Sequence, residues 1–358
     1  MTLSSLPKAP IVLLLILSLF GCKEAPKTQD CPLVKRTSFP RVRSNAVYHW
    51  KTVFDLKEEE TAFLDSHSIR KMYVRYFDVD VETSPMNASH SAIPVATTVF
   101  KSPKPAEIEI IPTVFITVKA LISAREGGVK DLASKIYTRV LNMSDYNDLG
   151  RVREIQLDCD WTGSTQELFY DLCRETVRLA HADSILVSST IRLHQLKMDP
   201  PPVDHGVLMV YNTGALRKTG TKNSILDYED VKSYLSGKPI QYDLPLDFAY
   251  PAYGWGVLFR NGNYAGILHK TDYSDETRYK KGKESTFVVK KDHVVEGEYL
   301  WEGDVIRLEY PAADVVIKVA DLVSRSVHDS THSVILYHLD SNNLLKFTND
   351  EISSIYSY

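Results

Sequence analysis

Residues 153–182 read REIQLDCDWTGSTQELFYDLCRETVRLAHA, and this stretch decides the fold. Residues 153–158 are expected to form a strand, because polar and apolar side chains alternate there. From Ser164 to Ala182 the apolar residues recur at helical spacing instead, and Cys173 lies on that apolar face. The stretch therefore predicts one strand followed by one helix, with Cys173 in the core.

Strand-like and helix-like segments alternate in the same way on both sides of this unit. Further strands are expected at residues 46–54, 70–77, 108–118, 184–196, 206–211, 244–249 and 333–339, and helices at 57–67, 127–143, 226–235, 313–327 and within 342–356. Eight apolar strands separated by helices predict a parallel sheet covered by helices. Eight such units in roughly 300 residues favour a closed barrel. The first strand is not followed by a Gly-rich turn, so the sequence does not favour an open nucleotide-binding sheet. The predicted fold class is α/β, a (β/α)8 TIM-like barrel.

One segment interrupts this order. Residues 255–310 contain glycines among alternating apolar residues, as in WGVLFRNGNYAGIL at 255–268. This pattern predicts β-hairpins inserted between the seventh and eighth strands. We therefore expect residues 45–358 to form one barrel domain with a β-rich insertion at about 255–310.

The amino terminus has the pattern of an export signal. Lys8 precedes the apolar run IVLLLILSLF at residues 11–20, which is too short to cross a bilayer, since that takes about 20 residues, but suits the centre of a signal peptide. Residues 19–22, LFGC, resemble the lipobox of bacterial lipoproteins, in which a small residue precedes the lipidated cysteine. An ordinary secretory signal beside a chance cysteine is the alternative.

We therefore expect residues 1–21 to be a lipoprotein signal peptide and Cys22 to carry the lipid, with palmitate-type acyl chains. Residues 22–44, rich in proline and charge, would form a tether. The expected location is the bacterial cell envelope, with the chain lipid-anchored to a membrane, either periplasmic or surface-exposed.

Composition excludes some classes of function and leaves others open. The net charge is −4, and the chain shows no basic stripe, so we expect no nucleic-acid partner. Beyond Cys22 only Cys31, Cys159 and Cys173 remain, an odd number that cannot form a complete disulfide framework. No G-x-S-x-G or H-E-x-x-H motif occurs. We expect a monomer with no cofactor and no metal.

The candidate site follows from the predicted barrel, in which the carboxyl ends of the strands form the active site. Acids at these ends are Asp78, Asp80, Asp158 and Asp160, and carboxylates suit acid/base chemistry on a glycosidic bond. The side chains expected to line a sugar site are Trp50, His194, Tyr211, Asn212, Tyr253 and Trp255, together with Asp80. The alternative is that these polar residues cap neighbouring helices or meet solvent.

Asp158 and Asp160 are the sharpest feature, because residues two apart at a strand end lie on the same face, with Gln156 one step deeper. Two close carboxylates repel, so one can gain a raised pKa and become a proton donor. They could equally bind a divalent cation. Asp160 could instead cap the helix that begins near Ser164.

The segment Gln156-Leu157-Asp158-Cys159-Asp160 resembles the fourth strand of chitinase-like family 18 glycosidases, whose motif is D-x-x-D-x-D-x-E. Asp158 and Asp160 match its last two aspartates, whereas Ile155 stands at the first aspartate and Thr162 at the catalytic glutamate. The resemblance implies a glycosidase-like barrel, and the departure at Thr162 means that the chemistry of that family does not carry over.

Taken whole, residues 47–345 resemble a family of barrel lipoproteins from Bacteroidetes. The likeness rests on YVRYFDVD (73–80), EIQLDCDWT (154–162), GVLMVYNTG (206–214) and FAYPAYGWGVLFRNGNYAGILH (248–269). This resemblance too implies a glycosidase-like barrel, without a defined reaction.

Two main hypotheses follow. In the first, a membrane-anchored glycosidase-like barrel acts on a carbohydrate, with Asp158 and Asp160 as the central acids and Asp78 or Asp80 as their partner carboxylate. In the second, the barrel has lost its catalytic acid and serves as a non-catalytic glycan-binding or envelope-assembly lipoprotein. A purely structural envelope lipoprotein is a third reading, in which the strand-end acids and aromatic residues would have no use.

Overall fold

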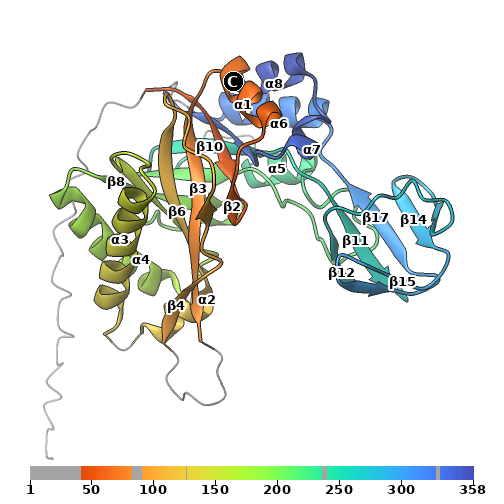
Figure 1. Cartoon of the computed structure of the whole chain (residues 1–358), viewed down its shortest axis with the longest axis horizontal. Helices are drawn as coiled ribbons and strands as arrows, with labels where there is room; N and C mark the ends of the chain where they lie inside the picture. The colour runs from red at the N-terminus through yellow and green to blue at the C-terminus, as the bar shows by residue number, and fades with distance from the viewer. Residues whose placement is uncertain (1–41, 83–90, 126, 236–239, 328–330) are drawn as a thin grey trace, which may run out of the picture. The chain divides into compact units, whose positions relative to one another are not determined.

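The structure is a computed structural model, and it describes residues 42–82, 91–125, 127–235, 240–327 and 331–358 (Figure 1). The predicted signal peptide, Cys22 and the tether as far as residue 41 lie outside these described residues. Residues Thr37–Tyr358 form one compact unit. No helix in the described part of the chain is long and apolar enough to cross a membrane.

Eight parallel strands form the central sheet and close it into a barrel. In spatial order they are β1 (Asn45–His49), β18 (Val334–Tyr337), β10 (Leu246–Pro251), β9 (His205–Met209), β8 (Leu186–Arg192), β7 (Glu154–Asp158), β6 (Glu109–Ile116) and β3 (Ile69–Val81). The barrel closes because β1 pairs in parallel with both β18 and β3. A ninth strand, β4 (Ala92–Val95), runs antiparallel to the end of β3. The predicted (β/α)8 barrel is confirmed.

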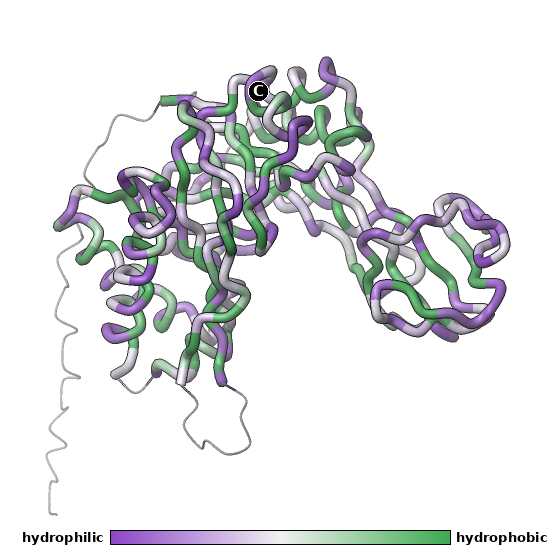
Figure 2. Tube along the Cα trace, viewed as in Figure 1, coloured by the Kyte–Doolittle hydropathy of each residue, from purple (hydrophilic) through white to green (hydrophobic). Residues whose placement is uncertain are grey.

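Helices cover the outside of the barrel. They are α1 (Glu58–Ser66), α2 (Val118–Ser123), α3 (Val129–Tyr146), α4 (Gln166–Ala182), α5 (Tyr228–Leu235), α6 (Ala313–Arg325), α7 (Ser341–Leu344) and α8 (Asn349–Tyr356). Figure 2 shows green and white along the barrel strands, whereas purple residues recur along the helices, as expected where only one helix face is buried. The buried faces of strands and helices form the main core, which includes Cys173, as predicted.

A second apolar cluster fills the inside of the barrel. It consists of Ala46, Tyr48, Tyr73, Ile111, Val207, Met209, Ala249 and Ile335. Members from the same strand, such as Ala46 and Tyr48, are two residues apart, because successive side chains in a strand point to opposite faces. Packed side chains therefore occupy the inside of the barrel beneath the carboxyl ends of its strands.

The segment between β10 and β18 carries the β-rich insertion. A five-stranded antiparallel sheet contains β11 (Trp255–Arg260), β12 (Asn263–Leu268), β13 (Tyr279–Lys281), β14 (Thr286–Val289) and β17 (Val305–Glu309). A separate hairpin pairs β15 (His293–Val295) with β16 (Glu298–Leu300). The sheet is joined to the barrel loop before α5, since Arg307 donates to the Lys218 carbonyl at 2.6 Å and Asn223 donates to the Tyr310 carbonyl at 3.0 Å.

Several expected strands are shorter in the structure, and for two of them the expected bounds were wrong by several residues. The segment expected at 46–54 is split into β1 and a two-residue strand β2 (Val53–Phe54), which pairs with β5 (Val99–Phe100). The segment expected at 184–196 ends as a strand at Arg192 and continues as the 3-10 helix η1 (Leu193–Lys197). The Gln195 side chain accepts from the Arg192 backbone N–H at 2.7 Å, which stabilises this turn.

Candidate functional site

A cavity of about 570 Å³ lies at the carboxyl ends of the barrel strands. Seven of the residues expected at the site line it together, from five different strands or the loops that follow them: Trp50, Asp78, Asp158, Asp160, His194, Tyr211 and Asn212. Residues up to 162 positions apart in the sequence thus line one cavity, because the carboxyl ends of the strands of a parallel barrel lie together.

Arg192 joins the two aspartates at the end of β7. Its Nη2 donates to Asp158 Oδ1 at 3.0 Å, and its Nε donates to Asp160 Oδ1 at 2.8 Å. Arg192 is the last residue of β8, the neighbour of β7, so its side chain and the two carboxylates meet at one level. The guanidinium thus takes the place between the carboxylates that a divalent cation would need. Asp160 is also bonded to Arg192 rather than serving as the N-cap of α4, which is Thr165.

Asp158 is the buried member of this pair, with 5% of its surface exposed. Its Oδ1 also accepts from Thr190 Oγ1 at 2.6 Å. Burial raises the pKa of Asp158 above its ordinary value; Arg192 and Thr190 lower the pKa but do not cancel the effect of burial. Asp158 is therefore the carboxyl group of the cavity best suited to hold a proton.

A β-bulge in β3 places a second Arg–Asp pair in the cavity. The pairing of β3 with β6 skips Tyr76, so that Arg75 and Asp78, three residues apart, both line the cavity. Arg75 Nε donates to Asp78 Oδ1 at 2.7 Å. The Arg75 guanidinium also lies over the Trp50 ring, 5.6 Å from its centroid. Both pairs supply charge, but each carboxylate is already bonded to an arginine.

Aromatic rings form the remaining wall around Tyr337, the last residue of β18. Its ring stacks on that of Tyr211 with centroids 5.0 Å apart, and it lies 5.9 Å from the Trp50 ring. Tyr48 lies 5.5 Å from Tyr337 and donates to Gln156 Oε1 at 2.7 Å, inside the barrel. Flat, rigid rings beside charged hydrogen-bonding groups are what the apolar faces and hydroxyls of a sugar require.

Three residues expected to bind substrate do not line the cavity. Asp80 accepts from Thr117 Oγ1 at 2.8 Å, further along β3. Tyr253 lies behind the cavity wall and donates to Asn212 Oδ1 at 2.6 Å. Trp255 donates from Nε1 to Glu309 Oε2 at 2.8 Å, within the insertion. Asn212 has a left-handed backbone, with φ 55°, so the bond from Tyr253 holds the amide of a residue in an uncommon conformation.

The sequence prediction missed Arg75, Arg192 and Tyr337 as site residues. Arg192 and Tyr337 are the last residues of their strands. The same criterion, position at a strand end, identified the predicted acids and could have identified these two residues. By simple alternation Arg75 shares the inward face of Tyr73, whereas residue 78 would lie on the opposite face, so Asp78 could not be placed beside Arg75 without the β-bulge.

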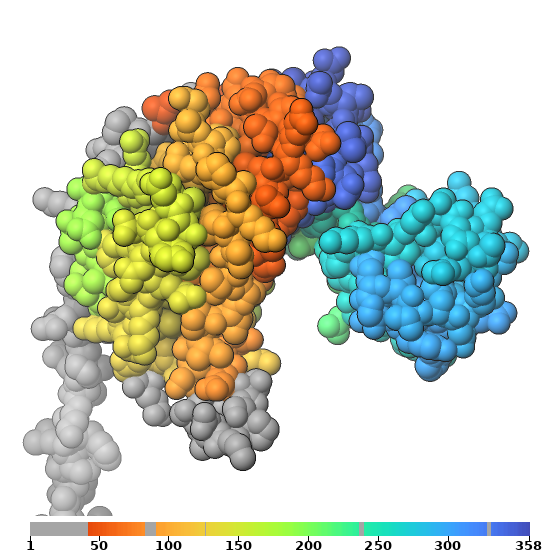
Figure 3. Space-filling view, viewed as in Figure 1, coloured from red at the N-terminus to blue at the C-terminus, as the bar shows by residue number. Residues whose placement is uncertain are grey.

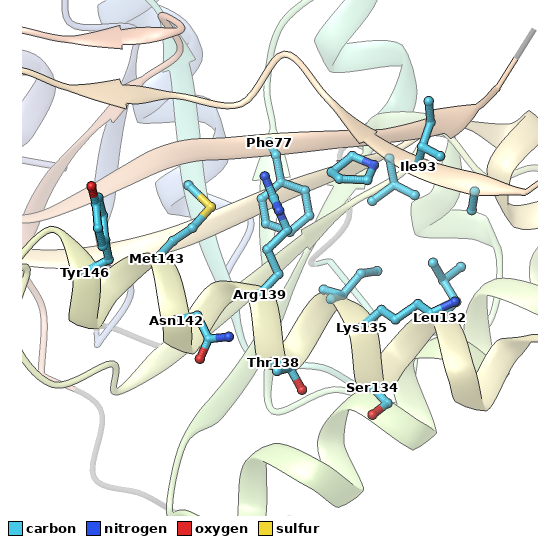
Figure 4. Close-up of a pocket in the computed structure, with 14 residues that line it drawn as sticks. Phe77, Ile93, Leu132, Ser134, Lys135, Thr138, Arg139, Asn142, Met143 and Tyr146 are labelled. Atoms are coloured by element: carbon cyan, nitrogen blue, oxygen red, sulfur yellow. The ribbon is translucent and has the colours of Figure 1, made fainter.

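A larger cavity, of about 680 Å³, lies between α3 and the paired strands β3 and β4. Figure 3 shows β3 and β4 in orange beside α3 in yellow, and Figure 4 shows Arg139 reaching from α3 toward Phe77. The Arg139 guanidinium lies 5.1 Å from the centroid of the Phe77 ring and donates to Thr97 Oγ1 at 3.1 Å. None of the residues expected at the site lines this mainly apolar cavity. Among the described residues, no group of three or more His, Cys, Asp or Glu side chains is placed to hold a metal ion.

No family model matches the chain, and no curated protein matches its sequence. Solved structures do match its fold. A chitinase from Chromobacterium violaceum has a TM-score of 0.50 at 10% identity, covering 88% of this chain and 98% of its own. The family 18 chitinase ChiB from the chitin utilization locus of Flavobacterium johnsoniae has the same score and identity, covering 88% and 94%. The spore cortex-lytic enzyme SleL of Bacillus cereus has a TM-score of 0.49 at 13% identity, covering 89% and 75%. The chain therefore has the barrel fold that family 18 chitinases have.

Proposed function

We propose that this barrel binds a glycan in the cavity at its strand ends. The observation that carries the proposal is the aromatic wall of Trp50, Tyr211 and Tyr337 beside hydrogen-bonding carboxylates and arginines in a single cavity. Rings can stack on the apolar faces of a sugar while charged groups bind its hydroxyls. Because chitinases share the fold, chitooligosaccharides are the first ligands to test.

The charges of the cavity favour a neutral sugar. Two arginines face three aspartates, and the most buried of these, Asp158, has a raised pKa. With Asp158 protonated the cavity is close to neutral, and with Asp158 ionised it is slightly negative. The cavity would therefore add little affinity for an acidic sugar, because its arginines are already bonded to carboxylates.

Binding without hydrolysis is the form of the proposal that the cavity supports best. Thr162 lines the cavity at the position where the family 18 motif has its acid, and Thr162 Oγ1 is hydrogen-bonded to Ser164 Oγ at 3.0 Å. All three cavity aspartates are bonded to arginines. The second candidate, glycoside hydrolysis, is favoured by one observation, the raised pKa of Asp158, which would let it donate a proton.

Trp50→Ala is expected to weaken glycan binding by about tenfold, because it removes a ring that stacks on the sugar (roughly 1–2 kcal/mol). Calorimetric titration of residues 37–358 with a panel of neutral and acidic oligosaccharides, chitooligosaccharides included, measures the effect. Trp301→Ala is the matched control, since Trp301 is 47% exposed and lies in the insertion, and it should bind as the unsubstituted chain does. If the unsubstituted chain, Trp50→Ala and Trp301→Ala bind with equal affinity, Trp50 does not contact the glycan. If the unsubstituted chain binds none of the oligosaccharides, the proposal is overturned.

Hydrolysis is tested in the same samples by measuring reducing ends. We expect no turnover by the unsubstituted chain or by Asp158→Asn. Turnover that disappears in Asp158→Asn while binding remains would establish the second candidate and give Asp158 the role of acid.

We also propose that the chain is a lipoprotein of the bacterial envelope, of the kind found in Bacteroidetes, anchored through Cys22. The apolar run at 11–20 and the small residue before Cys22 support this proposal. Cys22→Ser is expected to abolish incorporation of a palmitate analogue when the full chain is expressed in a bacterium. Cys31→Ser is the control and should label fully; label retained by Cys22→Ser would contradict the anchor.

A further inference from the structure

A basic pocket lies at the amino-terminal ends of β3, β6 and β7, at the other end of the barrel from the glycan cavity. It has a volume of about 340 Å³. Four cationic side chains line it, Arg70, Lys104, Arg151 and Arg153, and two acids, Glu107 and Glu109. The pocket is thus net positive in a chain whose overall charge is −4.

Within the described residues, the four cations have no carboxylate partner. None of the ion pairs formed within the described ranges includes them, and the bonds they do make go to backbone carbonyls. Lys104 Nζ lies 3.4 Å from the carbonyl oxygens of Pro105, Ala106 and Ile108, and Arg151 Nη2 donates to that of Asp183 at 3.2 Å. Arg70, Arg151 and Arg153 are exposed. Their charge is available to an anion from outside.

The chain enters the barrel at this same end. β1 begins at Asn45, which pairs in register with Ile69, the residue before Arg70. Because the barrel strands are parallel, the start of β1 and the starts of β3, β6 and β7 face the same side. The proposed tether, residues 22–44, is therefore joined to the barrel at the end that carries the basic pocket.

We propose that this end of the barrel lies against an anionic phospholipid surface, with the basic pocket receiving headgroup phosphates. Its position relative to the membrane rests on the proposed lipid anchor, whereas its charge does not. A basic surface adds electrostatic attraction to anionic lipids to the hydrophobic attraction of a lipid anchor. Bound this way, the barrel turns its glycan cavity away from the lipid.

The test is sedimentation of unlipidated residues 37–358, the compact unit with its own core, with vesicles. We expect binding to vesicles of 70% phosphatidylcholine and 30% phosphatidylglycerol at low salt, and none to pure phosphatidylcholine. Combined Arg70→Gln, Arg151→Gln and Arg153→Gln should weaken binding by at least about tenfold, because each cation near an anionic surface contributes separately. These three side chains are exposed, so the variant should fold, as its circular dichroism will verify.

The matched control replaces Lys280, Lys281 and Lys283, three exposed cations of the insertion, by glutamine. It changes the net charge equally and should leave binding within about twofold. Equal losses in both variants would show that only net charge matters and would overturn the proposal, as would the absence of binding to anionic vesicles. If the triple variant fails to fold, Arg153→Gln alone should still weaken binding more than Lys281→Gln does. Neither glycan nor lipid anchor takes part, so a negative result leaves the proposed function standing.

Discussion

Arg192→Met is expected to lower the free energy of unfolding by about 3–5 kcal/mol at neutral pH, the range for removing one partner of a buried ion pair. Arg192 is the cation bonded to Asp158, whose side chain is only 6% exposed. Methionine keeps much of the side-chain volume, so the decrease in the free energy of unfolding measures the removal of the positive charge rather than the creation of a cavity. Urea denaturation of residues 37–358 at pH 7 measures it.

The pH dependence of this loss follows from the pKa of Asp158. Burial already raises that pKa, and Arg192 opposes the rise, so its removal raises the pKa further. A carboxyl group with a raised pKa in the folded state keeps its stability at low pH and loses it as the pH rises through the folded value. The cost of Arg192→Met should therefore be smaller near pH 4 than at pH 7.

A double substitution isolates the pair. In an Asp158→Asn background Arg192→Met should cost much less, because no buried charge remains. Arg325→Met is the surface control: Arg325 is 77% exposed and pairs with Asp321, so less than about 0.5 kcal/mol is expected. An equal cost of Arg192→Met in both backgrounds would contradict the proposed pairing. In binding assays, loss of affinity without loss of folding would place Arg192 at the glycan.

Glu154→Gln is expected to cost about 3 kcal/mol above pH 5. Glu154 lies at the start of β7 with its side chain 2% exposed, and its Oε1 accepts from Ser188 Oγ at 2.6 Å and lies 3.2 Å from His205 Nε2. Burial alone would raise its pKa, but His205 and Lys71 outweigh burial and lower it to about 2. A shift of that size from the ordinary value corresponds to about 3 kcal/mol.

The sign is opposite to that for Asp158. A lowered pKa gives stability that is present above the unfolded value, near 4.5, and is lost as the pH falls toward 2. The difference between Glu154→Gln and the unsubstituted chain should therefore shrink between pH 5 and pH 2 in urea denaturation. Glu167→Gln, at a side chain 77% exposed, is the control and should show almost no difference at any pH. A cost that stays constant with pH would show that Glu154 acts through its shape rather than its charge.

These two carboxylates share β7 but have opposite pKa shifts, and their positions explain why. Glu154 meets Lys71 and His205 at the amino-terminal end of the strand, whereas the arginine beside Asp158 is shared with Asp160. The strand thus carries a structural ion cluster at one end and a candidate site at the other. This division follows the general polarity of barrels, in which stability lies at the amino-terminal ends and function at the carboxyl ends.

The sequence alone determined the order of strands and helices, and with it the barrel. Period-two alternation, as at residues 153–158, reports which strand faces are buried, and the spacing of apolar residues reports the helices, because both depend only on neighbours along the chain. The alternation of side chains along a strand also predicted correctly that Asp158, Asp160 and Gln156 share a face. Strand-end position brought Trp50, Asp78, His194, Tyr211 and Asn212 into the same cavity.

Tertiary structure alone decided which of these side chains are free to meet a ligand. The pairing of Arg192 with both aspartates joins residues more than 30 positions apart, and a local pattern carries no information about such contacts. The β-bulge at Tyr76 turned Asp78 to the inward face that carries Arg75, against the simple alternation on which sequence reasoning depends. Trp255, expected in the site, is instead bonded to Glu309 of the insertion, because the partner strand β17 lies 50 residues away and only the folded sheet brings it alongside.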